Sequence, residues 1–230
     1  MREKLISIIR RTPLEPLAFE MDERWWQLKG RVGGTFSQHG EDRIVRDYFG
    51  GRAGVYVDVG ANYPIKISNT YLLYRHGWRG LTIEPNPRLS QRHRRFRPRD
   101  IHLNMGVSST PGELTFYEFD VAGLSTFDPD RMREVMSWGG VTMREYKVRV
   151  QPLSELVPQH LGQQPVDLLS VDTEGHDLSV LQSADWTQFR PKLIIFEAGE
   201  HAAELETFAQ SKGYRPYRKV GCNIIVERAD

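Results

Sequence analysis

The sequence predicts an α/β protein built around a mostly parallel sheet with helices on both faces. Three short apolar runs, at 55–59, 166–171 and 193–196, are rich in valine, leucine and isoleucine. Such runs are typical of strands buried on both faces, as in the centre of a parallel sheet. Each run contains or precedes an acidic residue near its carboxyl end. In open α/β sheets ligands bind beyond the carboxyl ends of the strands, so these acids mark the expected site.

The first of these strands leads into a tight turn. Gly60 and Ala61 allow the backbone to turn sharply and to approach a ligand closely, because neither carries a large side chain. Asp58 lies where this strand ends, and Glu84 ends a second predicted strand at 81–83. An acid about 20 positions after a glycine turn is placed to accept hydrogen bonds from a ribose diol. Asp58 and Glu84 together therefore predict a nucleoside cofactor.

The turn is not a dinucleotide-binding GxGxxG motif. Pro64 and Lys66 occupy the stretch in which the later glycines would stand. That difference argues against a pyrophosphate on a helix N-terminus, and so against NAD or FAD. A purely structural alternative for Asp58 is an acid that ends a strand beside a helix N-terminus.

Composition limits the classes of protein further. The chain has 230 residues, 39% of them hydrophobic, which is enough for one substantial core with or without an extension. Its net charge of +1 gives no overall attraction to nucleic acids or membranes. The single cysteine, Cys222, excludes an internal disulfide framework and fits a reducing compartment. No apolar stretch approaches the ~20 residues that span a bilayer, and the N-terminus does not resemble a signal peptide. We therefore expect a cytoplasmic protein.

Residues 1–34 are expected to form a helical extension before the main domain. Segments 1–13 and 20–28 each have apolar spacing that fits a short helix. Trp25 and Trp26 are adjacent, so they cannot share one helix stripe. One of them either packs against the main domain or serves a partner surface or a substrate rim. The sequence does not decide whether this extension forms a homodimer.

Two later segments have more than one interpretation. Residues 88–99 hold six arginines and a histidine. Few aromatic residues interleave with them, so we expect a solvated helix face offset by acids elsewhere rather than a site for an anionic polymer. Residues 121–146 form either a lid over the binding face or a surface helix, at 129–137, that packs through its methionines.

The remaining elements follow from the helical and strand periodicities. A helix that Ser37 caps is expected first, and an antiparallel strand is expected last. Helices are expected at 38–48, 68–76 and 204–211, and strands at 101–103, 114–119 and 223–227.

Several motifs in order resemble one known family. They are DVGAN (58–62), SNTYLLY (68–74), GWRGLTIEPNP (77–87) and VDLLSVDTEGHDLSVL (166–181). Together they resemble the FkbM family of S-adenosylmethionine-dependent methyltransferases. SQHGED, further upstream, resembles a branch of that family often associated with sugar and polysaccharide methylation. The resemblance implies a class I methyltransferase fold at 35–230, which is a Rossmann-like, mostly parallel seven-stranded sheet with an antiparallel last strand.

The resemblance also implies where S-adenosylmethionine binds. One departure is visible, because Pro64 stands where many relatives have a glycine, so the loop under the cofactor is expected to be stiffer. Together with the acids discussed above, the expected cofactor contacts are Gln38, Asp58, Gly60, Ala61, Asn62, Ser68, Glu84, Pro85, Asn104, Gly106, Val107 and Asp172.

Transfer of the methyl group to an alcohol requires removal of a proton. A hydroxyl is a poor nucleophile until a base takes its proton or a metal lowers its pKa. His176 is the candidate base, since its unperturbed pKa of ~6.5 suits proton abstraction near neutrality. The alternative is a histidine that hydrogen-bonds within the Gly175 turn. Asp172 is the second candidate catalytic residue, or else a partner of the cofactor's ammonium group.

Two acids that end neighbouring strands are candidate Mg²⁺ ligands. Asp172 and Glu197 offer the oxygen atoms that Mg²⁺ prefers, and related macrolide sugar methyltransferases hold Mg²⁺ with acids at these strand ends. Ala198 stands where those relatives have a further acid. Glu174 and Asp177 either supply the missing ligand or cap the following helix.

The resulting functional prediction is an S-adenosylmethionine-dependent O-methyltransferase. Its expected acceptor is a sugar hydroxyl of a glycoside, polysaccharide or glycosylated natural product, and thus a small molecule or an oligosaccharide. One alternative is an N-methyltransferase acting on a small amine, which would predict an Asn/Asp-Pro-Pro-Tyr motif where VDTEGHD stands. Another is a catalytically silent, cofactor-binding interaction module.

Overall fold

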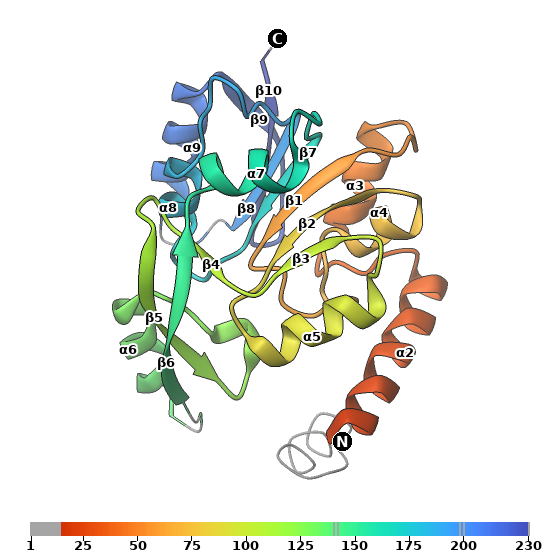
Figure 1. Ribbon diagram of the computed structural model, residues 1–230. Coiled ribbons are helices and arrows are strands. Elements are labelled where there is room, and N and C mark those ends of the chain that lie inside the picture. The colour runs from red at the N-terminus through yellow and green to blue at the C-terminus, as the bar shows by residue number, and fades with distance from the viewer. Residues whose placement is uncertain (1–14, 140, 142, 198, 200, 230) are drawn as a thin grey trace.

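The computed structural model of the protein describes residues 15–139, 141, 143–197, 199 and 201–229. The helix expected at 1–13 lies outside these residues. The described chain forms one large sheet flanked by helices, with a smaller sheet beside it (Figure 1).

The main sheet of the described residues has seven strands in the order β3-β2-β1-β7-β8-β10-β9. β1 pairs in parallel with β2 and β7, and β7 pairs in parallel with β8. β10 is antiparallel to both of its neighbours. The expected mostly parallel sheet with an antiparallel last strand is therefore confirmed. The strands are β1 (Val55–Val59), β2 (Arg79–Ile83), β3 (Ile101–Leu103), β7 (Leu168–Val171), β8 (Leu193–Glu197), β9 (Tyr214–Val220) and β10 (Asn223–Arg228).

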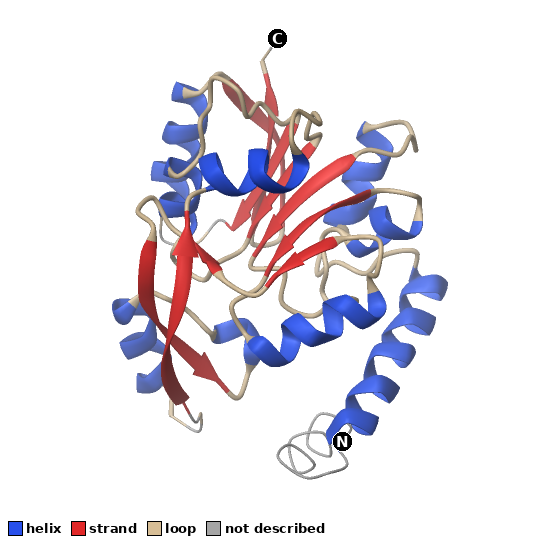
Figure 2. Cartoon of the chain, in the orientation of Figure 1, coloured by secondary structure: helices blue, strands red, loops and turns tan. Residues whose placement is uncertain are grey.

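Helices cover both faces of this sheet (Figure 2). Successive side chains of a strand point to opposite faces, so Tyr56 packs into one core cluster while Val55 and Val57 pack into the other. All five residues of β1 are buried, as expected for a central parallel strand. The Tyr56 cluster also contains residues of α3 (Glu41–Tyr48) and α4 (Tyr71–Arg75), and the opposite cluster contains residues of α7 (Leu153–Leu161), α8 (Asp177–Gln182) and α9 (Ala202–Ser211).

Two helices begin later than the sequence predicted. α3 starts after Gly40, which has a left-handed φ of 90°, and not after Ser37. The Ser37 hydroxyl instead accepts a hydrogen bond from the Gly40 amide at 3.1 Å. α4 starts at Tyr71, whose amide donates to the Ser68 hydroxyl at 3.1 Å. Both serines therefore shape the turn before a helix.

The strand predicted at 114–119 exists but belongs to a second sheet. β5 (Gly112–Phe119), β6 (Met143–Gln151) and β4 (Gly106–Val107) form this sheet in the order β4-β6-β5. η1 (Ala122–Leu124) and α6 (Pro129–Ser137) lie between β5 and β6 in the sequence, and the predicted helix at 129–137 is confirmed. The seventh strand of the main sheet is β9, which the sequence did not predict. Its exposed residues 215–219 give no apolar pattern.

The basic segment forms α5 (Pro87–Phe96) and the turn after it. Asn86 caps this helix by accepting hydrogen bonds from two backbone amides. Arg88 pairs with Glu118, and Arg95 pairs with Glu20 at 2.6 Å. Arg97 is fully buried and pairs with Asp100 at 2.7 Å. Acids elsewhere in the chain thus offset part of the basic run.

The N-terminal helix α2 (Glu15–Gly33) packs along α5 and the turn that leads to α3 (Figure 1). Its Gly30 lies against the ring of Phe36, where a Cβ atom would overlap that ring. Gln27 donates a hydrogen bond to the Tyr71 hydroxyl at 2.8 Å. The glycines at 30, 33 and 34 suggest a flexible link, but α2 continues to Gly33 and its inner face is packed.

The outer face of α2 is apolar and exposed. Leu17, Met21, Leu28 and Val32 are between 60% and 84% exposed, and Trp25 is 43% exposed. Trp26 is half-buried and meets the Trp25 ring edge-on at 5.2 Å between centroids. None of the described helices is long and apolar enough to cross a membrane.

Substitution of Gly60 tests how tightly the first turn is held. Gly60 has a φ of 75°, and a Cβ atom at this position would overlap the carbonyl oxygen of Asp172. We expect Gly60→Ala to lower the free energy of unfolding by at least about 2 kcal/mol in urea titrations. Gly33→Ala, which meets nothing within 4 Å, is the control and should be neutral or stabilising by up to about 1 kcal/mol. Equal stabilities would contradict this account.

Candidate functional site

A cavity of about 580 Å³ opens at the carboxyl ends of the central strands. Its wall includes residues from the ends of β1, β2, β7 and β8, and from the segment between β5 and α6. The predicted residues that line it are Gln38, Asp58, Gly60, Ala61, Asn62, Ser68, Glu84, Pro85, Gly106, Val107, Asp172, His176 and Glu197.

Asn104 was also predicted to contact the cofactor, and it is not in the cavity wall. Its side-chain amide donates hydrogen bonds to the carbonyl oxygens of Glu84 and Pro85, both at 2.9 Å. Asn104 therefore braces the chain that leaves β2, and its neighbour Met105 lines the cavity.

Four acids follow one another along the cavity because their strands are neighbours. Glu84 comes directly after β2, Asp58 lies in β1, Asp172 comes directly after β7, and Glu197 ends β8. These strands are adjacent and parallel in the order β2-β1-β7-β8. The order of the acids along the edge is thus set by the topology of the sheet.

The Glu84 carboxylate is held by two backbone amides. It accepts hydrogen bonds at 2.8 Å from the amide of Asn62 and from that of Asn86. Burial raises the pKa of Glu84 to about 7, although both hydrogen bonds oppose this shift. The carboxylate therefore changes its charge near neutral pH while it faces the cavity.

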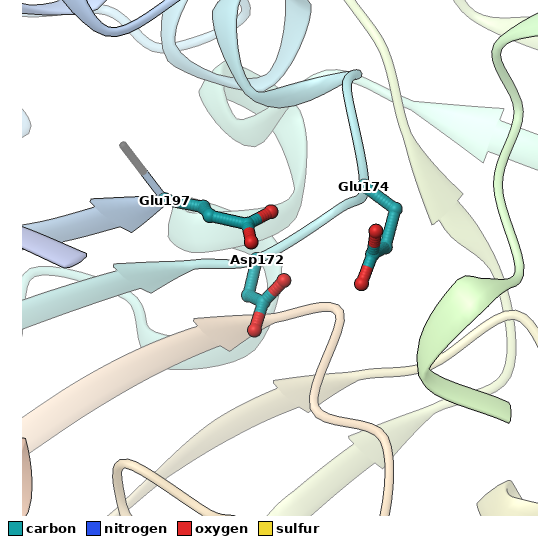
Figure 3. A group of neighbouring side chains, drawn as sticks. All are labelled: Asp172, Glu174 and Glu197. Carbon is teal, nitrogen blue, oxygen red and sulfur yellow. The ribbon is translucent and has the colours of Figure 1, made fainter. Parts of the chain in front are cut away.

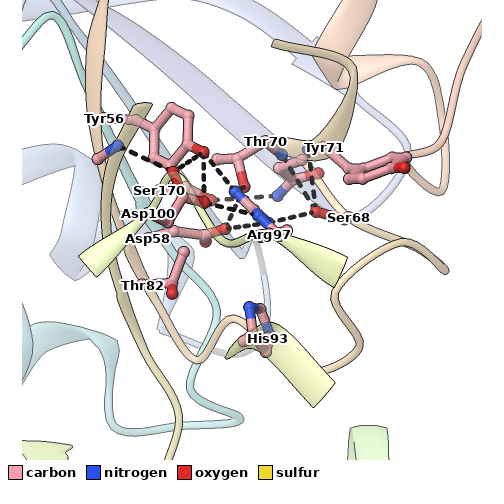
Figure 4. Close-up of polar contacts among 12 residues, drawn as sticks. Tyr56, Asp58, Ser68, Thr70, Tyr71, Thr82, His93, Arg97, Asp100 and Ser170 are labelled. Atoms are coloured by element: carbon pink, nitrogen blue, oxygen red, sulfur yellow. Dashed lines mark hydrogen bonds and ion pairs between the residues drawn. The ribbon is translucent and has the colours of Figure 1, made fainter. Parts of the chain in front are cut away.

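Asp58 lines the cavity and also belongs to a cluster of buried polar side chains (Figure 4). It accepts a hydrogen bond from the Thr70 hydroxyl, and the Arg97 guanidinium lies 4.0 Å from its Oδ2 atom. Burial raises the pKa of Asp58, and the positive charge of Arg97 opposes that rise.

Three carboxylates converge at one end of the cavity (Figure 3). Asp172, Glu174 and Glu197 each contribute an oxygen atom, and these atoms lie within 4.8 Å of one another. The Asp172 side chain is exposed towards the cavity that it lines. Desolvation by the surrounding protein, together with the negative charges of Glu197 and Glu174, raises its pKa well above the usual value.

Glu174 enters this group through a left-handed residue, with a φ of 52°. Its carboxylate pairs with Arg131 of α6 at 3.0 Å. Burial and the charge of Glu197 nevertheless raise the pKa of Glu174 to about 7. Asp177, the other acid considered as a ligand, accepts a hydrogen bond from the Thr173 hydroxyl at 3.0 Å. Ala198 lies outside the described residues.

His176 lines the same cavity as the three carboxylates. Its ring centroid is 5.9 Å from that of Phe127, and its Nε2 atom has no hydrogen-bond partner among the described residues. Burial lowers the pKa of His176, while Asp128 opposes this shift. The imidazole is therefore neutral at pH 7 and able to accept a proton.

Other parts of the cavity wall were not predicted. Phe19 and Asp22 reach it from α2, and Phe116 and Phe127 reach it from beyond the main sheet. Residues 120–125 also line it, so the start of the segment interpreted as either a lid or a surface helix borders the cavity. Cys222 lies in the wall as well. No local sequence pattern could have revealed the α2 residues, because only the packing of that helix brings them there.

The family model described as Methyltransferase FkbM domain matches residues 58–216, more than half of the chain. The chain belongs to this family. The prediction of an S-adenosylmethionine-dependent methyltransferase of the FkbM family is confirmed, and the matched residues contain the four acids at the ends of β2, β1, β7 and β8. No curated protein sequence matches this FkbM methyltransferase significantly.

Several solved structures are similar to this FkbM methyltransferase. A TehB-like SAM-dependent methyltransferase from Corynebacterium glutamicum is 12% identical, with 94% of this chain and 100% of that chain covered and a TM-score of 0.46. A methyltransferase from Geobacter sulfurreducens is 12% identical, with 88% and 86% covered and a TM-score of 0.46. The 1,6-didemethyltoxoflavin-N1-methyltransferase from Burkholderia thailandensis, with bound S-adenosylhomocysteine, is 13% identical, with 83% and 77% covered and a TM-score of 0.43.

The raised pKa of Glu84 predicts pH-dependent cofactor binding. A ribose diol donates two hydrogen bonds, and only the ionised carboxylate accepts both of them. With a pKa of about 7, ionisation between pH 6 and pH 8 should tighten the Kd for S-adenosylmethionine about tenfold in calorimetry. Glu84→Gln should bind more weakly and with a shallower pH dependence. Glu113→Gln, on the exposed part of β5, is the control, and a wild-type Kd that stays constant over this range would refute the assignment.

Proposed function

We propose that this FkbM methyltransferase transfers the methyl group of S-adenosylmethionine to a sugar hydroxyl of a glycoside, polysaccharide or glycosylated natural product. The observation that carries the proposal is that a neutral histidine and a group of three carboxylates line the same cavity. A histidine that accepts a proton next to a cluster of oxygen ligands suits an alcohol acceptor, which must lose a proton. The sugar class comes from the resemblance of the SQHGED segment alone.

The cofactor is proposed to lie along the row of strand ends. The ribose binds to Glu84 at β2, and the adenine lies beside Met105, Gly106 and Val107, which also line the cavity. The amino-acid part then extends over β1 towards Asp58 and Asp172. This arrangement leaves the β7–β8 end of the cavity, with His176, for the acceptor.

Positioning is expected to supply much of the catalysis. The sulfonium methyl is already strongly electrophilic, and alignment of donor and acceptor contributes ~7–11 kcal/mol in favourable cases. The residues around Glu84 and Asp58 would hold the donor, and His176 would take the proton of the acceptor hydroxyl as the new carbon–oxygen bond forms. S-adenosylhomocysteine and the methylated sugar are the products.

The three carboxylates fit a divalent cation. Their oxygen atoms already lie within 4.8 Å of one another, and Mg²⁺ takes oxygen ligands and keeps several waters. Asp172, Glu174 and Glu197 would hold the ion, and Arg131 pairs with only one of these acids in the described residues. When bound, Mg²⁺ would lower the pKa of a coordinated acceptor hydroxyl.

The decisive experiment is a methyl-transfer assay with labelled S-adenosylmethionine. The purified protein would be incubated with a panel of glycosides and oligosaccharides and with a matched panel of primary amines, each with and without Mg²⁺. Label on sugars alone would support the proposal. Label on amines would favour the N-methyltransferase alternative, and cofactor binding without any transfer would favour the silent binding module.

Replacement of His176 tests the proton acceptor. We expect His176→Ala to lower kcat by about 10²- to 10⁴-fold, the usual contribution of a general base. The Kd for S-adenosylmethionine, measured by calorimetry, should change less than about twofold, because the histidine is proposed to face the acceptor. His160→Ala on α7, outside the cavity wall, is the control. An unchanged kcat in His176→Ala would remove the histidine from the mechanism.

Metal binding can be tested on stability as well as on activity. A cation that binds only the folded protein stabilises it by about 2.7 kcal/mol when present at 100 times its Kd. We therefore expect Mg²⁺ to raise the melting temperature of the wild type and to have little effect on Glu197→Gln. Glu204→Gln, exposed on α9, should respond like the wild type. The metal assignment fails if both variants and the wild type show the same response.

A further inference from the structure

Arg97 is a fully buried charge that contacts Asp58 of the cavity wall without lining the cavity itself. Its side chain is 0% exposed. Its guanidinium donates hydrogen bonds to the Asp100 carboxylate at 2.7 Å, the Tyr56 hydroxyl at 2.6 Å and the Thr70 hydroxyl at 2.9 Å. A longer bond of 3.4 Å reaches the Ser68 hydroxyl. The guanidinium thus joins the end of α5 to β1 and to the segment before α4 (Figure 4).

Thr70 transmits this arrangement to the cavity. A hydroxyl has one hydrogen to donate and can accept at its lone pairs. Because the Thr70 oxygen accepts from Arg97, its hydrogen is directed to the Oδ2 atom of Asp58. Thr70 therefore holds Asp58 at its Oδ2 atom, and Asp58 also lines the cavity.

The charges of this cluster do not cancel. The closest partner of Arg97 is Asp100, at 2.7 Å, and this pair is neutral by itself. Asp58 adds a second carboxylate at 4.0 Å from the same guanidinium, so Arg97, Asp100 and Asp58 together carry one net negative charge when both acids are ionised. Asp58 is the member of this group that lines the cavity. A cationic group is its natural ligand, and a primary ammonium can donate three hydrogen bonds.

The proposed position of the donor places such a group there. With the ribose at Glu84 on β2, the amino-acid part of S-adenosylmethionine passes over the neighbouring strand β1, which carries Asp58. We propose that Arg97 is a positioning residue for the methyl donor, because through Thr70 it holds the Asp58 carboxylate in place to bind the donor's ammonium group. This inference rests on the cofactor arrangement given under Proposed function.

Two ligands that differ only in the amino-acid part separate this role from general stabilisation. S-adenosylhomocysteine carries the ammonium group, whereas 5′-methylthioadenosine keeps the adenosine and the thioether and lacks it. Both would be titrated by calorimetry into the full-length protein. The variant Thr70→Val removes the hydroxyl that links Arg97 to Asp58 and keeps the size and all the charges. Its matched control is Thr82→Val, since Thr82 is also fully buried but hydrogen-bonds to His102 at 2.8 Å.

We expect Thr70→Val to weaken S-adenosylhomocysteine binding about tenfold, in the range of a lost hydrogen bond to a charged group. Binding of 5′-methylthioadenosine should change less than about twofold. Arg97→Lys, which keeps the charge but not the fork of donors, should show the same selectivity. Asp58→Asn should weaken S-adenosylhomocysteine binding by a smaller factor in the Thr70→Val background than in the wild-type background. The two changes should not add, because both act through one carboxylate. Thr82→Val should show no preference between the two ligands.

Equal weakening of both ligands by Thr70→Val would overturn the proposal, because it would show that the cluster supports only the fold. Unchanged binding of S-adenosylhomocysteine would overturn it as well. If the wild type bound 5′-methylthioadenosine and S-adenosylhomocysteine equally well, the ammonium contact itself would be excluded, while the nucleoside site at Glu84 would stand. If the wild type bound neither ligand, the cofactor arrangement would fail, and the role of Arg97 with it. Circular dichroism would establish that each variant is folded, and Thr70→Val provides the test should Arg97→Lys fail to fold.

Discussion

The parallel pairing of β1 with both β2 and β7 is the constraint on which the site depends. Val59 is in register with Ile83 on one side and with Val171 on the other, so the three strands end at the same level. The Gly60 amide then donates to the Ile83 carbonyl at 3.0 Å, and the glycine itself lies against the Asp172 carbonyl. A side chain at this point would push the neighbouring strand ends apart. The acids that follow these strands face one cavity because of this close contact.

The same arrangement concentrates negative charge in an enclosed space. Burial raises the pKa of Glu84, Asp58 and Asp172, so each of these acids is harder to ionise than in water, and a nearby cation would favour its ionised form. Arg97 offsets part of the charge of Asp58, and Arg131 offsets part of the charge of Glu174. A ligand with a sulfonium and an ammonium group would reduce the electrostatic repulsion between the acids of the cavity. A divalent ion would reduce the repulsion among the three converging carboxylates. The charge distribution therefore favours cationic ligands over anionic ones.

The central strands could be predicted because burial on both faces leaves an apolar run in the sequence, and their acids lie within the same short segments. β9 could not, because only Tyr214 among its residues is buried. β5 was recognised as a strand, but its place in a second sheet could not be predicted, since its partner β6 lies further along the chain and pairing between separate segments leaves no local pattern. The sequence left the role of Glu174 open, because no local pattern indicated its left-handed backbone. That backbone brings the carboxylate to Asp172 and Glu197.

The packing of α2 has a consequence for where this enzyme can be shortened. The helix places Phe19 and Asp22 in the cavity wall, and its Gly30 and Gln27 cover Phe36 and Tyr71. A truncated protein that began at residue 35 would keep every strand of the sheet. It would also open one side of the cavity and bring the edge-to-face pair of Phe36 and Tyr71 into contact with water. Limited proteolysis that removed α2 would therefore damage the binding site before it unfolded the sheet.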